Sequence, residues 1–522
     1  MSLDEKKQKK QQKAVLIFSI FIAGVCSIIY ELLISTTASY FQGDSIKQFS
    51  ITIGIYMAAM GLGSFLSRLI KTSLLQRFIQ AEIVLALIGG SAVPFMYLFF
   101  IYMDSWGFQF MMILLILVIG ILIGLEIPLI TRIMKEYYPL KINLSNVLSV
   151  DYFGALAATL LFPFLLLPFV GVFRSSLIFG LINLSIGFIN LWYFAPVVKI
   201  KRKSVYWISL FGVLAYFCLM LFFADKLMGG WNSKIFRNPI IYNEQTQYQN
   251  LTLTKGGDII SLYIDRVIQW SSTDEHRYHE SLVHIPMAQS DTIKSVLVLG
   301  GGEGLALREV LKYPQVQNVD IVDLDKGVFE LAIKNPFLLE INQSSLLDPR
   351  VHRIPEDAFK FLKTSQKTYD LIISDLPDPL NESLSRLYSK SFFNMCYYHL
   401  NPDGLFVTQA TSPFDTPNAF WCIEQTLEAS LFGQATPYHT LVPSFGDWGF
   451  IMASQNQTLT LVASPQFPMD SKYLTQELYP HLFYFSKDQK KRKVQVNTLD
   501  NPKLLNYFLK DWKRWNYSST NI

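Results

Sequence analysis

Seven long apolar stretches fill the first 225 residues and restrict how this part of the chain can fold. Each is long enough to cross a hydrocarbon core of about 30 Å as a helix that rises about 1.5 Å per residue. The stretches are residues 14–34, 48–67, 80–101, 108–131, 147–170, 175–197 and 205–224. A cleaved signal peptide is disfavoured, because the first stretch is long and six more follow it. We therefore expect residues 1–225 to form a multi-span α-helical membrane domain.

The composition agrees with a chain that lies partly in lipid. Of the 522 residues, 51% are hydrophobic and 16% are charged, and the mean hydropathy is +0.27. The net charge of +4 favours neither a nucleic acid nor an acidic partner. The cysteines are scattered without a CxxC pair, which favours reduced thiols over a disulfide framework or a zinc site. They are Cys26, Cys218, Cys396 and Cys422.

Basic residues divide the segments between the apolar stretches into two kinds. The N-terminus and alternate loops are rich in Lys and Arg, whereas the other loops carry little beyond Lys47 and Arg174. The basic loops contain Arg68, Lys71, Arg77, Arg132, Lys135, Lys141, Lys199, Lys201, Arg202 and Lys203. The positive-inside rule places the N-terminus in the cytoplasm, so seven crossings would put the C-terminal half outside. Either the proline-broken segment 161–169 re-enters one face, or residues 205–224 lie along the interface.

Four ionisable residues lie in or beside the apolar stretches, namely Glu31, Arg68, Glu126 and Asp151. A charge inside the membrane is costly and suggests a function, such as binding of a cation. The alternative is that Glu31, Arg68 and Asp151 lie near span ends and reach the headgroups. That explanation fits Glu126 least well.

The pattern changes to short alternating elements from residue 248. Residues 240–290 are expected to form a small antiparallel β-sheet subdomain followed by a helix. Residues 291–460 alternate strands with helices, which predicts a Rossmann-like α/β domain of the class I methyltransferase type; residues 461–522 are expected to form a helical tail. The expected strands are 295–299, 318–323, 351–354, 369–374 and 404–409, and the helices are 304–312, 326–334, 357–364 and 389–400.

Acidic residues follow the carboxyl ends of these strands, where open α/β sheets bind their ligands. They are Glu303, Asp323, Asp325, Asp357, Asp375 and Asp378. Asp323 lies about twenty residues beyond the glycine turn, where an acid binds ribose hydroxyls, and Asp357 suits an adenine edge. The turn does not meet the GxGxxG spacing, and Glu303 would repel a pyrophosphate. A nucleoside without phosphates, such as an S-adenosyl compound, fits better.

The position of Glu303 separates the possible S-adenosyl ligands. In a methyltransferase, the methionine carboxylate would lie near this glutamate and be repelled by it. A decarboxylated ligand would instead present a cationic aminopropyl group, which Glu303 attracts. Asp375 and Asp378 suit a di-cationic amine, although they could also be N-caps of the next helix. A methyltransferase and a polyamine transporter or sensor with a synthase-like domain are the competing interpretations.

Several motifs resemble those of the aminopropyltransferases, the spermidine synthase family. They are "YQNLTL", "VIQWSSTDEHRYHESLVHIPM", "VLVLGGGEGLALREVL", "VDIVDLDKGVFELA" and "YDLIISDLPDP", in order over about 242–455, and the first 225 residues resemble the membrane-bound bacterial members. The resemblance implies transfer of an aminopropyl group from decarboxylated S-adenosylmethionine to putrescine, without a metal or prosthetic group. The products would be spermidine and methylthioadenosine. Spermidine, cadaverine and agmatine are alternative acceptors, and a homodimer is usual in this family.

The resemblance also assigns roles to individual residues. The nucleoside would be bound by Gln249, Gln269, Asp323, Asp357 and Ala358. Glu303 would hold the aminopropyl amine, whereas Tyr278, His279 and Asp378 would bind the acceptor. Asp375 would be the catalytic proton acceptor, since an ammonium must lose a proton before it attacks carbon. Tyr278 and His279 could instead belong to an ordinary helix surface.

The sequence departs from the family pattern at four points. Glu303 replaces an aspartate and Ala358 replaces a glycine, while Leu376–Pro377 and Asn381–Glu382 replace small or Gly–Pro residues. These departures leave the reaction in place but put the length of the acceptor in doubt. Because the co-substrate is made in the cytosol, we expect the catalytic half to face the cytoplasm, against the simple span count. The basic run 487–493 is either a solvated loop or a contact with anionic lipid.

Overall fold

The computed structural model describes residues 3–42, 45–135, 137, 140–196, 203–236, 238–457 and 459–516. The chain divides into two compact units, Met1–Arg237 and Asn238–Ile522. Lys199, Lys201 and Arg202, which the sequence analysis placed in a basic loop, lie outside the described residues.

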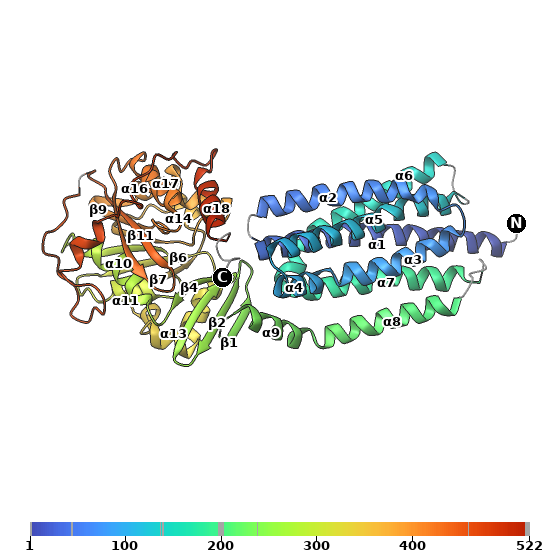
Figure 1. The fold of residues 1–522 in the computed structure, drawn as a ribbon, viewed down its shortest axis with the longest axis horizontal. Helices are drawn as coiled ribbons and strands as arrows, with labels where there is room; N and C mark the ends of the chain where they lie inside the picture. Colours follow the sequence, from blue (N-terminus) through green and yellow to red (C-terminus); the bar gives the residue numbers. More distant parts are fainter. Residues whose placement is uncertain are drawn as a thin grey trace. The chain divides into compact units, whose positions relative to one another are not determined.

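The first unit is a bundle of long helices (Figure 1). Six helical segments are long and apolar enough to cross a membrane, and α3 with α4 makes a seventh that is bent by 45°. Each of the seven apolar stretches is therefore mainly helical in the residues that the structure describes. The helices are α1 (Leu3–Gln42), α2 (Ser45–Leu66), α3 (Leu74–Gly90), α4 (Ala92–Tyr102), α5 (Ser105–Met134), α6 (Leu140–Leu161), α7 (Val172–Phe194), α8 (Lys203–Phe222) and α9 (Ala224–Ile235).

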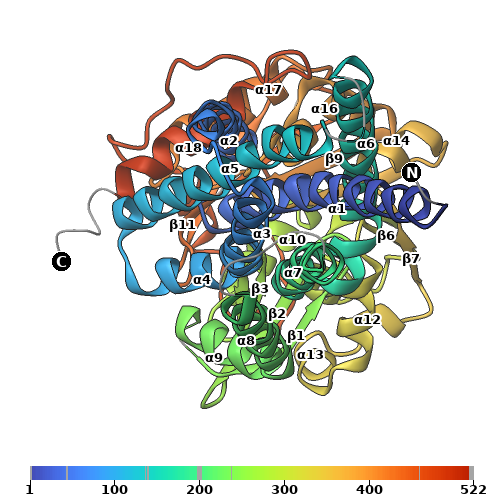
Figure 2. The same ribbon diagram turned by 90° about the vertical axis from the view of Figure 1, so that its right-hand side faces the viewer.

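The segments run along the bundle in alternating directions. Residues 67–73 lie at the end where α1 begins, and α5 begins at the opposite end, so α3 and α4 together run the length of the bundle (Figure 1). Seen from the end at which the chain begins, α2 and α6 lie on one side of the bundle and α8 and α9 on the other (Figure 2). Because successive segments alternate in direction, the last long helix, α8, ends at the end of the bundle opposite the start of α1 (Figure 1).

The proline-rich segment 161–169 does not turn back in the structure. Phe162–Val170 form a π-helix that continues α6, and Ile142–Val170 together make one candidate span. The wider π-helical turn leaves room for Pro163 and Pro168, whose rings lack an N–H donor. The bend falls instead at Ser91, between α3 and α4.

The second unit begins with a four-stranded antiparallel sheet in the order β1-β2-β3-β4, followed by helix α10. These elements form the small β-subdomain that the sequence predicts. Their bounds are β1 (Ile240–Gln245), β2 (Asn250–Gly256), β3 (Ile259–Ile264), β4 (Val267–Ser271) and α10 (Glu275–Met287).

A seven-stranded sheet in the order β10-β11-β9-β8-β5-β6-β7 forms the centre of this unit. The strands β5 to β9 are parallel, and β10 and β11 add an antiparallel pair, so the Rossmann-like fold is confirmed. The strands are β5 (Ser295–Gly300), β6 (Asn318–Asp323), β7 (Val351–Pro355), β8 (Tyr369–Asp375), β9 (Leu400–Gln409), β10 (Thr436–Val442) and β11 (Gly446–Ser454).

Helices cover both faces of the large sheet. On β5, Val296 and Val298 pack with the helices of one layer, whereas Leu297 and Leu299 pack with those of the other. This explains why the strand is an unbroken apolar run. One layer holds α10, α11 (Leu305–Val310), α12 (Lys326–Lys334) and α13 (Pro336–Ile341), and the other holds α14 (Ala358–Thr364), α16 (Lys390–Tyr398) and α17 (Pro417–Glu428).

The C-terminal segment differs from the expected helical tail. Residues 461–502 are mostly irregular in the part that the structure describes, apart from the short 3₁₀ helix η5 (Tyr479–Phe483). Three prolines, Pro465, Pro468 and Pro480, disfavour a continuous helix there. A regular helix returns only at α18 (Lys503–Asn516). Lys491, in the basic run, forms ion pairs with Glu424 at 2.6 Å and Glu428 at 2.9 Å.

Candidate active site

The glycine turn after β5 lies directly beside the end of β8. Gly300 is paired with Asp375 across the two parallel strands. A Cβ atom on Gly301 would lie 2.9 Å from the Asp375 carboxylate, and one on Gly302 would lie 2.7 Å from that of Asp323. Both are closer than real Cβ contacts, so the turn needs glycine to admit the two carboxylates. The backbone thereby brings Asp375 and Asp323 to the two sides of one loop.

Four of the predicted residues meet at this edge of the sheet. Tyr278 donates a hydrogen bond from its hydroxyl to Oδ1 of Asp375 at 2.6 Å. Nε2 of His279 lies 3.8 Å from Oε1 of Glu303. Side-chain ligand atoms of His279, Glu303 and Asp375 lie within 4.8 Å of one another. Tyr278 and His279 are 8% and 2% exposed, so they are not an ordinary helix surface.

His279 is also held by a buried ion pair between Glu275 and Arg308, which the sequence analysis did not identify. Nδ1 of His279 lies 2.8 Å from the Glu275 carboxylate, which also accepts two hydrogen bonds from Arg308 at 3.0 and 2.9 Å. Burial opposes ionisation of Glu275, but His279 and Arg308 outweigh it and lower its pKa to about 2. For His279, burial is likewise outweighed by Glu275, which raises the imidazole pKa. The separation of four residues between Glu275 and His279 was the available sequence signal.

Burial and mutual repulsion perturb the acids of the site. Burial, together with the nearby Asp375, raises the pKa of Glu303 to about 7, although His279 opposes this shift. Burial also raises the pKa of Asp375 despite His279 and the hydrogen bond from Tyr278. Raised pKa values of this kind are typical of buried acids at sites that bind a cationic ligand.

Asp378 lies on the loop after β8, whose main chain accepts hydrogen bonds from Tyr388 and Gln409. Burial raises its pKa to about 7, and its Oδ1 atom has no hydrogen-bond partner among the described residues. Gln409 donates to the carbonyl of Leu376 at 2.7 Å, and Tyr388 donates to those of Leu376 at 2.9 Å and Pro377 at 3.0 Å. The unusual Leu376–Pro377 pair is therefore held by its main chain, and the Asp378 carboxylate has capacity for a ligand.

The residues assigned to the nucleoside fall into separate groups. Asp323 accepts N–H groups from Gly302 at 3.1 Å and Asp325 at 3.0 Å, and burial raises its pKa to about 6. Asp357 caps α14, the helix that begins at Ala358, and pairs with Arg386 at 2.5 Å. Both acids retain capacity to accept hydrogen bonds at the sheet edge.

The two predicted glutamines are less closely connected to the acids. Gln249 lies in the turn of Thr246, whose hydroxyl donates to Asp325 at 2.6 Å, beside the loop after β6. The Gln269 amide donates to the carbonyl of Val267 in its own strand at 3.1 Å. Among the described residues, Gln269 makes no hydrogen bond to Asp323.

Three aromatic residues surround the ring of Tyr278. Its ring centroid lies 6.0 Å from that of Phe445, 6.5 Å from Trp448 and 5.3 Å from Phe450. Phe445 and Trp448 lie in or next to the β10–β11 hairpin, which the sequence analysis did not assign as strands. Such rings suit the methylene chain of a polyamine.

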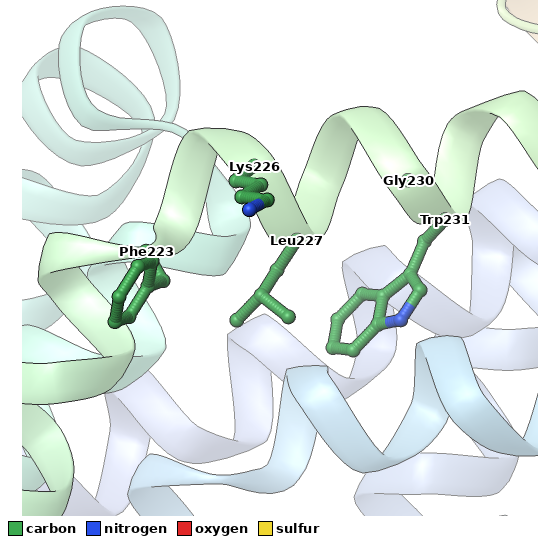
Figure 3. Close-up of a pocket in the computed structure, with 5 residues that line it drawn as sticks. All are labelled: Phe223, Lys226, Leu227, Gly230 and Trp231. Atoms are coloured by element: carbon green, nitrogen blue, oxygen red, sulfur yellow. The ribbon is translucent and has the colours of Figure 1, made fainter.

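A separate hollow occurs in the first unit (Figure 3). It has a volume of about 410 Å³ and is lined by Phe223, Lys226, Leu227, Gly230 and Trp231. Figure 3 shows that the lining side chains come from α9 and the residue before it. The lining is apolar apart from a cation, so this hollow is unsuited to a cationic amine.

Comparison with known proteins identifies the family. Residues 275–463 match the family described as "Spermine/spermidine synthase domain". The polyamine aminopropyltransferase of Leptospira interrogans is 37% identical over 510 residues, which cover 96% of this chain and 99% of that protein. The chain belongs to the polyamine aminopropyltransferase family.

A second relative and one solved structure complete the comparisons. The polyamine aminopropyltransferase 2 of Ralstonia nicotianae is 38% identical over 505 residues, covering 96% of this chain and 98% of that protein. A crystal structure of spermidine synthase in complex with the transition-state analogue AdoDATO is 26% identical and has a TM-score of 0.44, covering 47% of this chain and 85% of that one. As a member of this family the chain is an aminopropyltransferase, and the methyltransferase interpretation is not supported.

Proposed function

We propose that this aminopropyltransferase uses decarboxylated S-adenosylmethionine as the donor and putrescine as the acceptor, with spermidine and methylthioadenosine as products. The observation that carries this proposal is the group of buried acids at the glycine turn and the end of β8. Glu303, Asp375 and Asp378 are available for cations, while Tyr278 and His279 lie against them. No prosthetic group or metal is part of the proposal.

The donor would be oriented by both ends of the acidic edge. Asp323, Asp357, Ala358 and the Gln249 turn would bind the nucleoside, and Glu303 would hold the cationic propylamine. A carboxylate on the same carbon would lie close to Glu303 in a buried site, where repulsion between like charges is strong. The site would therefore prefer the decarboxylated donor to intact S-adenosylmethionine. Gln269 remains a weaker candidate for this role, because its amide already bonds Val267.

In the proposed reaction the acceptor amine first passes a proton to Asp375. The free amine then forms a bond to the methylene carbon attached to the sulfonium, and the carbon–sulfur bond breaks with its electron pair moving to sulfur. Burial raises the pKa of Asp375, which makes its carboxylate a better base. Tyr278 holds one oxygen of that carboxylate at 2.6 Å, which fixes its direction. The distal ammonium of putrescine would pair with Asp378, and alignment of the reacting atoms would supply much of the rate.

The test is product identification by mass spectrometry with the purified full chain. Decarboxylated S-adenosylmethionine would be supplied with putrescine, cadaverine, agmatine or spermidine. We expect spermidine from putrescine to form fastest. A faster product from another amine would correct the acceptor, and methylated amines made from intact S-adenosylmethionine would overturn the proposal.

Two variants on one strand provide a matched control. Asp375→Asn removes the proposed base and should lower turnover by about 10²- to 10⁴-fold. Asp370→Asn lies at the other end of β8, where the carboxylate accepts the N–H groups of Lys294 and Ser295 at 2.9 Å. This second variant should lower stability but retain turnover. Equal loss of turnover in both would remove the special role assigned to Asp375.

We further propose that the helical bundle anchors the enzyme in a lipid bilayer with the catalytic half facing the cytoplasm, where the co-substrate is made. Seven crossings with the basic loops inside would instead put residue 222 on the other face. Cysteine labelling decides between these arguments: the variant Asp258→Cys, at an exposed position, should react at that cysteine with a membrane-impermeant maleimide only after cells are lysed. Labelling of intact cells would overturn the cytoplasmic assignment. Homodimer formation remains a prediction.

A further inference from the structure

Two acidic side chains lie inside the apolar bundle of the first unit. Glu82 of α3 is 0% exposed and Glu126 of α5 is 4% exposed, and the adjacent Asn183 of α7 is fully buried. The sequence analysis noted Glu126 but not Glu82. Neither acid can reach the end of a span by extending its side chain, since both are covered by the bundle. Aminopropyl transfer gives these residues no role.

These three side chains are directly connected. Nδ2 of Asn183 donates to Oε2 of Glu82 at 3.0 Å and to the Glu82 carbonyl at 3.2 Å. The carboxyl groups of Glu82 and Glu126 lie near enough to interact directly. A hydrogen bond between them needs a proton on one of the two groups, because two carboxylates have no donor.

Three oxygen atoms of this cluster have no partner among the described residues. They are Oε1 of Glu82, Oε1 of Glu126 and Oδ1 of Asn183, and all are buried. Leaving a buried acceptor unsatisfied is energetically costly. Asn183 is directed at Glu82 through its amide nitrogen, so its unsatisfied oxygen lies in the same polar cluster. The cluster thus offers acceptors in excess of donors.

The neighbouring groups do not correct this imbalance. Tyr30 donates its hydroxyl to Phe179 at 3.1 Å, and Tyr56 donates to Ser27 at 2.7 Å. Cys26 lies 3.9 Å from the Phe179 carbonyl, and Asp151 is a further acid. The titratable groups that interact with Glu126 come from α1, α2, α3 and α6 and are Cys26, Tyr30, Tyr56, Glu82 and Asp151. None of them supplies a positive charge.

We propose that Glu82, Glu126 and Asn183 form a binding site for a small hard cation, either a proton or Na⁺. Oxygen ligands from carboxylates and an amide suit such an ion, and an ionisable group within an apolar bundle is a functional candidate. The site connects α3, α5 and α7, so occupancy would draw three helices together. Exchange of the cation would give the bundle a cation-dependent conformational change that is separate from catalysis.

Direct binding measurements on the purified full chain in detergent micelles test this proposal. Radioactive Na⁺ would be added at alkaline pH, with choline chloride holding the ionic strength constant. If Na⁺ is the ligand, it should bind at one ion per chain and release a proton. Glu82→Gln and Glu126→Gln should each weaken binding by about tenfold or more, while Glu31→Gln, in half-buried surroundings on α1, should leave it unchanged.

Infrared spectroscopy tests whether the ligand is a proton. If a proton is the ligand, the wild-type chain should show a carboxylic C=O band that disappears reversibly at alkaline pH and is reduced in Glu126→Gln. This readout needs only the wild-type chain, should the variants fail to fold. The proposal is overturned if Na⁺ does not bind and the band is unaffected by pH, because the pair would then be a fixed structural contact.

Discussion

Replacing Glu303 with glutamine removes a charge but little volume, and the consequences can be worked out from the site. The carboxylate is 13% exposed, lies 3.8 Å from Nε2 of His279, and repels the buried Asp375. Two unit charges about 4 Å apart attract by about 4 kcal/mol at an effective dielectric constant of about 20. Desolvation offsets part of this attraction, so a hydrogen bond between Glu303 and the propylammonium should contribute about 1.5–3 kcal/mol.

This free energy predicts a large kinetic effect. In Glu303→Gln, kcat/KM for decarboxylated S-adenosylmethionine should fall by about 10- to 150-fold. The affinity for intact S-adenosylmethionine, measured as a competing ligand, should rise because its carboxylate is no longer repelled. The ratio by which the site prefers the decarboxylated donor should therefore fall by more than kcat/KM for that donor falls.

The same residue predicts a pH dependence. Burial and Asp375 raise the pKa of Glu303 to about 7 in the free protein, so its attractive charge is present above that pH and lost below it. The kcat/KM of the wild type for the donor should fall as pH drops through about 7. This decrease should be weaker in Glu303→Gln, which has no charge at 303 to lose.

Steady-state kinetics over pH, with thioether release as the readout, measure both effects. Glu303→Asp is the matched control, since it keeps the charge and loses one methylene. It should retain more activity than Glu303→Gln and keep the pH dependence. The reasoning is refuted if glutamine costs less than about threefold or leaves ligand preference unchanged in a folded protein.

Three other perturbations test separate parts of the account. Asp375→Asn should lower kcat by about 10²- to 10⁴-fold with little change in donor binding, measured by single-turnover kinetics; a matching loss of donor affinity would argue against a base. Glu275→Gln should lower the free energy of unfolding by about 1.5–3 kcal/mol, because the buried Arg308 loses one of its two charged partners and keeps Glu309 at 2.7 Å; denaturant unfolding in micelles checks this, and a loss under about 1 kcal/mol would contradict it. Trp448→Ala should raise the KM for the diamine and leave that for the donor unchanged; the reverse pattern would place the aromatic wall at the nucleoside.

Much of the catalytic fold could be predicted from local patterns. The strands β5, β6 and β8 are largely apolar runs that end at a glycine turn or an acid. The observed bounds of these strands and of β7 agree with the expected ones within a residue or two. β9 begins at Leu400, earlier than expected, because pairing with Tyr369 extends it. The β10–β11 hairpin was not anticipated, since its pairing with β9 depends on contacts that are distant in sequence.

The site itself could be predicted only in part. The hydrogen bond between Tyr278 and Asp375 joins residues 97 positions apart, which no periodicity reveals; the motif resemblance supplied that pair. The Glu275–Arg308 ion pair was missed because the sequence does not show which charged residues on two separate helices are buried against each other. Glu82 was missed because one acid at the edge of an apolar stretch resembles a residue at a span end.

The most direct test of the central claim is a calorimetric comparison of ligand binding to the wild-type chain. The account holds that buried acids select a donor whose carboxyl group has been removed. Decarboxylated S-adenosylmethionine should therefore bind at least about tenfold more tightly than intact S-adenosylmethionine near neutral pH. Equal affinities for the two ligands would contradict the account.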